Sequence, residues 1–153
     1  MMRLLFTLMM GLTFAACGGP SSAPLAQQSQ AAGVSATTTV NRIRGRAGVS
    51  GVKRSGVLNA VAQAHADDMA TNNFFGHTGS NGLTVAQRVK RAGYKWCVVS
   101  ENVAKGYKSR ARAIETWRTS KGHYQNIVNG KAREFGLAQA GDYWVMVLAA
   151  KRC

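Results

Sequence analysis

The residues best suited to chemistry in this chain are two histidines and a glutamate that lie far apart in the sequence. His77 lies in "NNFFGHTGSNG", a stretch typical of a loop, and loops carry functional residues more often than packed elements do. Its two phenylalanines are expected to anchor the loop on the core while His77 points into a cleft. His123 opens "HYQNIVN", where Gly122 is expected to allow a sharp turn before a short helix. An exposed loop histidine is the alternative for His77.

Glu101 lies in "VVSENVA", an otherwise apolar stretch that predicts a strand. A buried carboxylate needs hydrogen-bond donors or a cation, because an unpaired buried charge is costly. His77 and His123 would meet that need if they lay beside Glu101. The alternative is an edge-strand glutamate that faces water.

Two imidazoles and a carboxylate are also a ligand set for a divalent metal such as zinc. In this interpretation His77 and His123 hold the metal and Glu101 activates water. The three residues form no local motif such as HExxH, so their spacing favours a metal only weakly. Ser120 and His123 could also act as nucleophile and base, but the Ser-x-x-His spacing supplies no oxyanion hole. Ser120 is equally suited to a cleft role or to capping the following helix.

The surrounding sequence predicts the elements that must position these residues. Apolar residues at three- and four-residue steps, with His65 as a hydrogen-bonded core residue among them, predict a helix in "SGVLNAVAQAHADDMATNN". Further helices are expected from Thr37 to Gly45 or Gly48, from Thr84 as N-cap to Gly93, and over "SRARAIETWRTS". Strands are expected over "WCVVSENVA" and in a hairpin of "KAREFGLAQA" and "DYWVMVLAA". This order predicts an α+β fold with helices on a small antiparallel sheet.

The aromatic residues within these elements are expected in the core. They are Trp96, Trp117, Tyr143 and Trp144. Sugar stacking is the alternative use for such side chains.

The first 17 residues have the features of a secretory signal. Arg3 precedes an apolar run from Leu4 to Ala16, which is shorter than the roughly 20 residues of a membrane-spanning helix. The corner ending at Cys17 resembles a bacterial lipoprotein cleavage box, although Phe14 departs from the usual aliphatic residue. We expect lipidation of Cys17, with ordinary signal cleavage after Ala36 as the alternative. The small, uncharged residues 18–36 then predict a flexible tether.

The formal net charge is +14, from 20 Lys+Arg against 6 Asp+Glu. This excess favours anionic partners, and export argues against nucleic acid. The expected partners are anionic lipid, an envelope polymer or an amphiphilic small molecule.

Three cysteines also fit an exported chain. Lipidation of Cys17 leaves Cys97 and Cys153 to form a disulfide, with two free thiols as the alternative.

Six stretches in this order resemble the CAP superfamily of cysteine-rich secretory proteins, antigen 5 and pathogenesis-related 1 proteins, in its compact bacterial form. They are "VNRIRGRAGV", "LNAVAQAHADDMATNNFFGHTGSNG", "RVKRAGY", "SENVAKG", "AIETWRTSKGHYQNIVNGKAREFGLA" and "YWVMVL". The resemblance covers residues 37–153 and implies an α-β-α sandwich. It also implies a cleft with two histidines, here His77 and His123, and two acids. The first acid is Glu101, whereas Ser120 stands at the second position.

Members of this superfamily have been associated with sterol or fatty-acid binding, divalent metals and occasionally proteolysis, without one common reaction. We therefore expect an exported binding module, lipid-anchored in the bacterial envelope or secreted, rather than an enzyme. A metal-dependent hydrolase or peptidase using the same cleft is the alternative. A third interpretation is a scaffold whose cleft residues only stabilise the fold.

Overall fold

The computed structural model describes residues 35–153. The predicted signal segment, Cys17 and the tether up to residue 34 lie outside the described residues. No helix among residues 35–153 is long and apolar enough to cross a membrane. The first helix begins at Ala36, slightly earlier than predicted, because Ser35 is its N-cap and accepts a hydrogen bond from the Thr38 backbone N–H.

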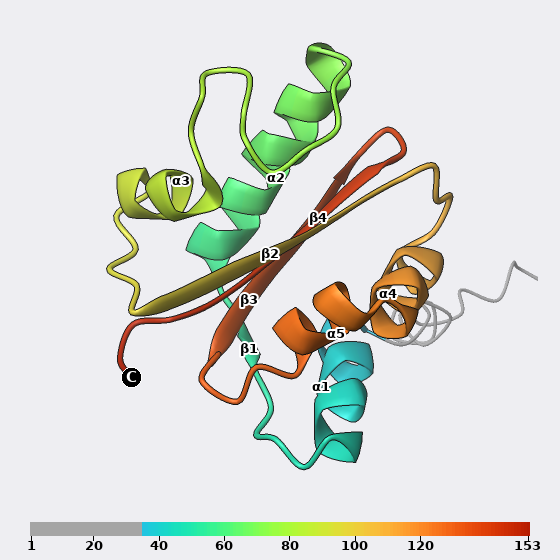
Figure 1. The fold of residues 1–153 in the computed structure, drawn as a ribbon, viewed down its shortest axis with the longest axis vertical. Coiled ribbons are helices and arrows are strands. Elements are labelled where there is room, and N and C mark those ends of the chain that lie inside the picture. The colour runs from blue at the N-terminus through green and yellow to red at the C-terminus, as the bar shows by residue number, and fades with distance from the viewer. Residues whose placement is uncertain (1–34) are drawn as a thin grey trace, which may run out of the picture. The chain divides into compact units, whose positions relative to one another are not determined.

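Residues 35–153 form five helices and four strands (Figure 1). The helices are α1 (Ala36–Arg46), α2 (Gly56–Thr71), α3 (Val85–Arg91), α4 (Arg110–Thr119) and α5 (Lys121–Ile127). The strands are β1 (Lys53–Arg54), β2 (Val98–Lys105), β3 (Glu134–Ala140) and β4 (Tyr143–Ala150). The predicted N-cap of α3 is observed, since Thr84 and Gln87 form a capping box.

The strands form one sheet in the order β1-β3-β4-β2, so β2 is an edge strand. β2, β3 and β4 pair antiparallel as predicted. The sheet is nevertheless mixed, because the short β1, which the sequence did not predict, pairs parallel to β3. Two residues are too few to produce the alternation by which a strand is recognised.

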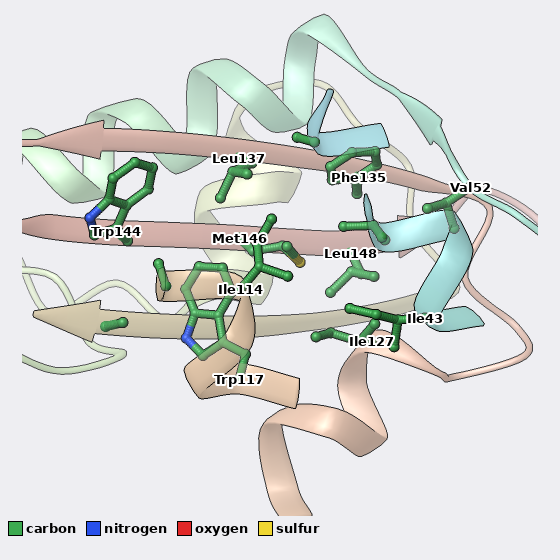
Figure 2. Packing of buried hydrophobic residues seen from close by; sticks show 14 of the residues in the cluster. Ile43, Val52, Ile114, Trp117, Ile127, Phe135, Leu137, Trp144, Met146 and Leu148 are labelled. Carbon is green, nitrogen blue, oxygen red and sulfur yellow. The ribbon is translucent and has the colours of Figure 1, made fainter. Parts of the chain in front are cut away.

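Helices cover both faces of the sheet in an α-β-α sandwich, with α2 and α3 on one side and α1, α4 and α5 on the other (Figure 1). All eight residues of β4 are buried because successive side chains enter opposite layers. Trp144, Met146 and Leu148 belong to the same buried cluster as Trp117 of α4 (Figure 2). The intervening residues of β4 pack against α2, which carries the predicted apolar stripe.

Two local expectations were wrong. Trp96 is 38% exposed, whereas Trp117, Tyr143 and Trp144 are buried as expected. Gly122 does not form the turn before α5, because it lies inside that helix. The chain bends instead at Ser120, an extended residue (φ −92°, ψ 123°) between α4 and α5.

Cys97 and Cys153, for which the sequence predicts a bridge, are joined by a disulfide that links the start of β2 to the C-terminal segment. The S–S distance is 2.07 Å.

A histidine–carboxylate cluster at the edge of the sheet

Glu101 lies in β2 with its side chain turned toward α2 and α3. Its cross-strand partner is Val147, which packs in the α2 layer. The next residue, Asn102, pairs with Met146 and belongs to the opposite layer. Adjacent residues of one edge strand therefore supply polar groups to both sides of the sheet.

The Glu101 side chain is 1% exposed, so the water-facing alternative is wrong. Arg88 Nη2 donates to Glu101 Oε2 at 2.6 Å, and His77 Nδ1 donates to Oε1 at 2.9 Å. The carboxylate thus has a cation and two donors, which offset the cost of removing it from water.

Arg88 was not identified from the sequence, although it holds the cluster together. Its Nη1 donates to the backbone oxygens of His77, at 2.9 Å, and Leu83, at 2.7 Å. One guanidinium therefore fixes both the carboxylate and the loop that carries His77. Arg88 follows Val85 by three residues and precedes Val89 by one, so it lies beside the apolar face of α3. That position is the feature of the sequence from which an inward-facing arginine could have been predicted.

His65 of α2 is buried beneath the loop, as its place on the apolar stripe predicted. Its Nε2 donates to the Gly76 backbone oxygen at 2.9 Å and lies 3.9 Å from Glu101 Oε1. Burial lowers the pKa of His65, which favours the neutral ring. Its Nδ1 atom has no hydrogen-bond partner within residues 35–153. His65 and Arg88 both line a cavity of about 590 Å³ between α2 and α3.

His77 joins this cluster to the surface, because its side chain is 56% exposed. The hydrogen bond to Glu101 raises the pKa of His77, which favours the imidazolium. Of the two preceding phenylalanines, Phe74 packs against the core, whereas Phe75 is 52% exposed. The prediction that both would anchor the loop was therefore wrong for Phe75, which leaves an apolar side chain two residues from His77.

His123 approaches from the other layer, on α5. Its Nδ1 lies 3.0 Å from the Ser120 hydroxyl, and its backbone oxygen accepts a hydrogen bond from Asn102 Nδ2 at 3.0 Å. Asn126 Nδ2 donates to the Glu101 backbone oxygen at 3.2 Å and to Asn102 Oδ1 at 2.8 Å. These amides tie α5 to the strand that carries Glu101.

No role was predicted for Asn102 from the sequence. The one feature that could have indicated a role is that this polar residue lies in an otherwise apolar strand. Ser120 makes no side-chain cap to α5 and contacts the imidazole of His123 instead. Burial, and then the positive charge of His77, lower the pKa of His123. The pKa values of His77 and His123 are therefore shifted in opposite directions.

The donor set does not fit a three-ligand zinc site. Both carboxylate oxygens of Glu101 accept hydrogen bonds from Arg88 and His77, and His77 uses its Nδ1 for that contact. Ser120 stands where a second acid would add charge. In residues 35–153, no group of three or more His, Cys, Asp or Glu side chains is arranged to hold a metal ion. The expected metal ligands His77 and His123 thus lack a third protein ligand of this kind.

Comparisons with known proteins agree with this architecture. A model of the cysteine-rich secretory protein family, CAP, matches residues 37–147. The uncharacterized protein YkwD of Bacillus subtilis strain 168 is 26% identical over 113 residues, which cover 72% of this chain and 44% of YkwD. The chain therefore spans less than half the length of that relative.

Two solved structures share the fold. One is an extracellular protein containing an SCP domain from Bacillus anthracis str. Ames, with 24% identity, a TM-score of 0.73, and coverage of 75% of this chain and 39% of the other. The second is an outer surface protein from Borrelia burgdorferi, with 20% identity, a TM-score of 0.68, and coverage of 76% of this chain and 90% of the other.

Proposed function

Because the chain belongs to the cysteine-rich secretory protein family, we propose that it is a binding domain of the bacterial cell envelope. Its ligand is an amphiphile whose polar or anionic head contacts His77 and His123. The basic surface of the protein contacts anionic envelope components. The extracellular and outer-surface proteins that share its fold support an envelope location.

The observation that carries this proposal is the hydrogen bonding of the Glu101 carboxylate. Its two oxygens are occupied by Arg88 and His77, so the carboxylate acts as a buried anchor rather than as a free base. Its hydrogen bond raises the pKa of His77, which favours the imidazolium, and the exposed Phe75 lies two positions away in the same loop. An imidazolium and an exposed aromatic ring in one loop match the two ends of an anionic amphiphile.

Binding of dodecyl phosphate, measured by calorimetry with the full chain, tests this site. We expect His77→Gln and Phe75→Ala each to weaken binding about five- to tenfold, the scale of one charged contact or one apolar contact. Arg46→Gln, an exposed change in α1, is the matched control and should leave binding unchanged. Equal affinity in all four proteins would refute the proposed site.

The basic surface is tested with vesicles. The protein should sediment with anionic vesicles at low salt and should not bind neutral vesicles. High salt should release it from the anionic vesicles, because salt screens exposed charges. Equal binding to both kinds of vesicle would contradict the electrostatic part of the proposal.

A lipid anchor at Cys17 belongs to the same proposal. The mature protein from bacterial membranes should be heavier than the unmodified chain from residue 17 to residue 153 by the mass of the attached lipid. Cys17→Ser should release the protein from the membrane fraction. An unmodified mature mass would exclude the anchor.

A hydrolase is the second candidate, favoured by the 3.0 Å contact between Ser120 Oγ and His123 Nδ1 and by the lowered pKa of His123. A short-chain p-nitrophenyl ester separates the two functions. A binding domain should show no turnover above the Ser120→Ala variant, whereas turnover that Ser120→Ala abolishes would establish the hydrolase.

A further inference from the structure

We propose that the end of α3 and the start of β2 form a docking surface for anionic phospholipid membranes. The Trp96 surface consists of Lys90, Lys95, Trp96 and Lys151. This inference rests on the proposed function, since it assigns the anionic partner to one face and to one kind of molecule.

Trp96 is the side chain that gives this surface an apolar centre. It is 38% exposed, although the other two tryptophans are buried. Its Nε1–H already donates to the Ala86 backbone oxygen at 3.1 Å, which satisfies the only polar group of the indole. The exposed part of the ring therefore gains no hydrogen bond from water. Tryptophan in that state favours the interface between lipid headgroups and acyl chains.

Cations surround this ring. Lys90, Lys95 and Trp96 line the same hollow of about 520 Å³. Lys151 Nζ lies 5.1 Å from the centre of the Tyr94 ring, which also lines that hollow. Among residues 35–153, none of these three lysines forms a salt bridge with a carboxylate. Their charges are available to lipid phosphates, in contrast to Arg88, whose charge is used by Glu101.

Glu134 contacts Tyr94 but, within residues 35–153, forms no salt bridge with the lysines of this surface. Glu134 Oε2 accepts a hydrogen bond from the Tyr94 hydroxyl at 2.6 Å. The chain has only 6 acidic residues in total, so few carboxylates compete with lipid phosphates for the lysines.

Two covalent and backbone features hold the surface in shape. Gly93, with φ of +77°, ends α3 in a left-handed turn that directs the chain toward Lys95 and Trp96. The disulfide between Cys97 and Cys153 then holds the C-terminal residues next to the start of β2, and the Cys97 N–H donates to the Ala150 oxygen at 2.9 Å. Residues far apart in the sequence are thereby preorganised on one face.

This combination favours a membrane over a soluble polyanion. A polysaccharide or other soluble polyanion would engage the lysines but gain little from an indole whose N–H is already bonded. A bilayer offers phosphate to the lysines and apolar depth to the ring in the same contact.

The full chain with the Cys17→Ser change, which removes any lipid anchor, tests the inference with phosphatidylcholine vesicles that either lack or contain phosphatidylglycerol. Trp117 and Trp144 are buried, so a change in tryptophan emission on binding reports on Trp96. We expect a blue shift with phosphatidylglycerol only. Replacing Lys90, Lys95 and Lys151 by Gln should weaken binding at least about tenfold, and Trp96→Ala should remove the shift and weaken binding about fivefold.

The matched control replaces three exposed cations elsewhere, Arg42, Arg46 and Lys131, by Gln, which keeps the same net charge as the triple lysine variant. If both triple variants lose affinity equally, net charge alone explains binding and the surface assignment fails. The assignment also fails if dextran sulfate binds with an affinity that Trp96→Ala reduces as much as it reduces vesicle binding. If the unaltered protein ignores phosphatidylglycerol, both this inference and the electrostatic part of the proposed function fail. Circular dichroism and thermal unfolding establish that each variant is folded.

Discussion

At the scale of single residues, the cluster is arranged around one buried carboxylate. Glu101 accepts from Arg88 and His77, and the same arginine holds the backbone of the His77 loop. Removal of Arg88 or of Glu101 would leave the charge of the other residue buried without its partner. That loss is more costly than the loss of an exposed ion pair. The positions of these side chains are therefore interdependent.

The protonation of the histidines follows from this arrangement and can be measured by NMR titration. We expect the pKa of His77 above its ordinary 6.5, because of the hydrogen bond to Glu101, and that of His123 below 6.5, because of burial. Glu101→Gln should bring the pKa of His77 down. A pKa of His77 that does not respond to Glu101→Gln would contradict the hydrogen bond.

The sign of the effect on stability follows from the direction of the shift. Because the folded-state pKa of His77 is raised, its contribution is fully present below the unfolded-state pKa near 6.5. That contribution is lost as the pH rises through the folded-state pKa. The difference in free energy of unfolding between the wild type and His77→Ala should therefore shrink as the pH is raised from about 6 to 8.

At the scale of elements, α2 crosses β3 with no room for a side chain at Gly136. A Cβ there would overlap the backbone of Leu58 and Asn59. We expect Gly136→Ala to destabilise the protein by about 3 kcal/mol or to prevent folding, because two backbones must separate. Chemical denaturation measures the change.

Gly45 is the matched control for that substitution. It lies in α1, and a Cβ at this position would meet nothing within 4 Å. Gly45→Ala should raise the free energy of unfolding by roughly 0.5–1 kcal/mol, since alanine is the better helix former. Similar losses at Gly136 and Gly45 would mean that the close crossing is not what requires glycine.

Arg44 connects α1 to the segment after α5. Its guanidinium is buried and donates to the backbone oxygens of Ser50, Ile127, Asn129 and Ala132. Burial lowers its pKa, and four accepting oxygens would lose their donor in Arg44→Met. We expect this change to cost about 3 kcal/mol, against less than about 0.5 kcal/mol for the exposed Arg46→Met. Equal unfolding midpoints for the two variants would contradict the structural role of Arg44.

At the scale of the whole molecule, two cores share one sheet, and the site straddles its edge. Glu101 belongs to the α2 layer and Asn102 to the α5 layer, so His77 and His123 reach β2 from opposite sides. Neither layer alone contains both histidines. Formation of the site therefore depends on the complete sandwich.

The disulfide secures the strand that carries this site. Cys97 and Cys153 are 56 positions apart, so the bridge restricts a large part of the unfolded chain. On the chain-entropy model it contributes about 4 kcal/mol. Cys153→Ser should therefore lower the midpoint of denaturation, and a reducing agent should lower it in the wild type but not in the variant. An identical midpoint for wild type with and without reductant would exclude this contribution.

Local patterns in the sequence were sufficient for the features that depend on neighbouring residues. The stripe of α2, the Thr84 cap, the β3–β4 hairpin and the antiparallel pairing of the long strands follow from short-range periodicity and turn chemistry. The resemblance of six stretches to a known family supplied the sandwich and the set of site residues. These features could be predicted because contacts within one element depend on neighbouring residues and not on the rest of the chain.

The tertiary structure alone decided which distant groups meet. It paired Arg88 with Glu101, aligned β1 with β3, exposed Trp96 and placed the bend at Ser120 rather than Gly122. A cation on a basic helix, or an aromatic residue before a strand, has several possible environments that sequence spacing does not distinguish. Packing selects among them, because the observed arrangement gives the buried carboxylate its donors and fills both layers of the core.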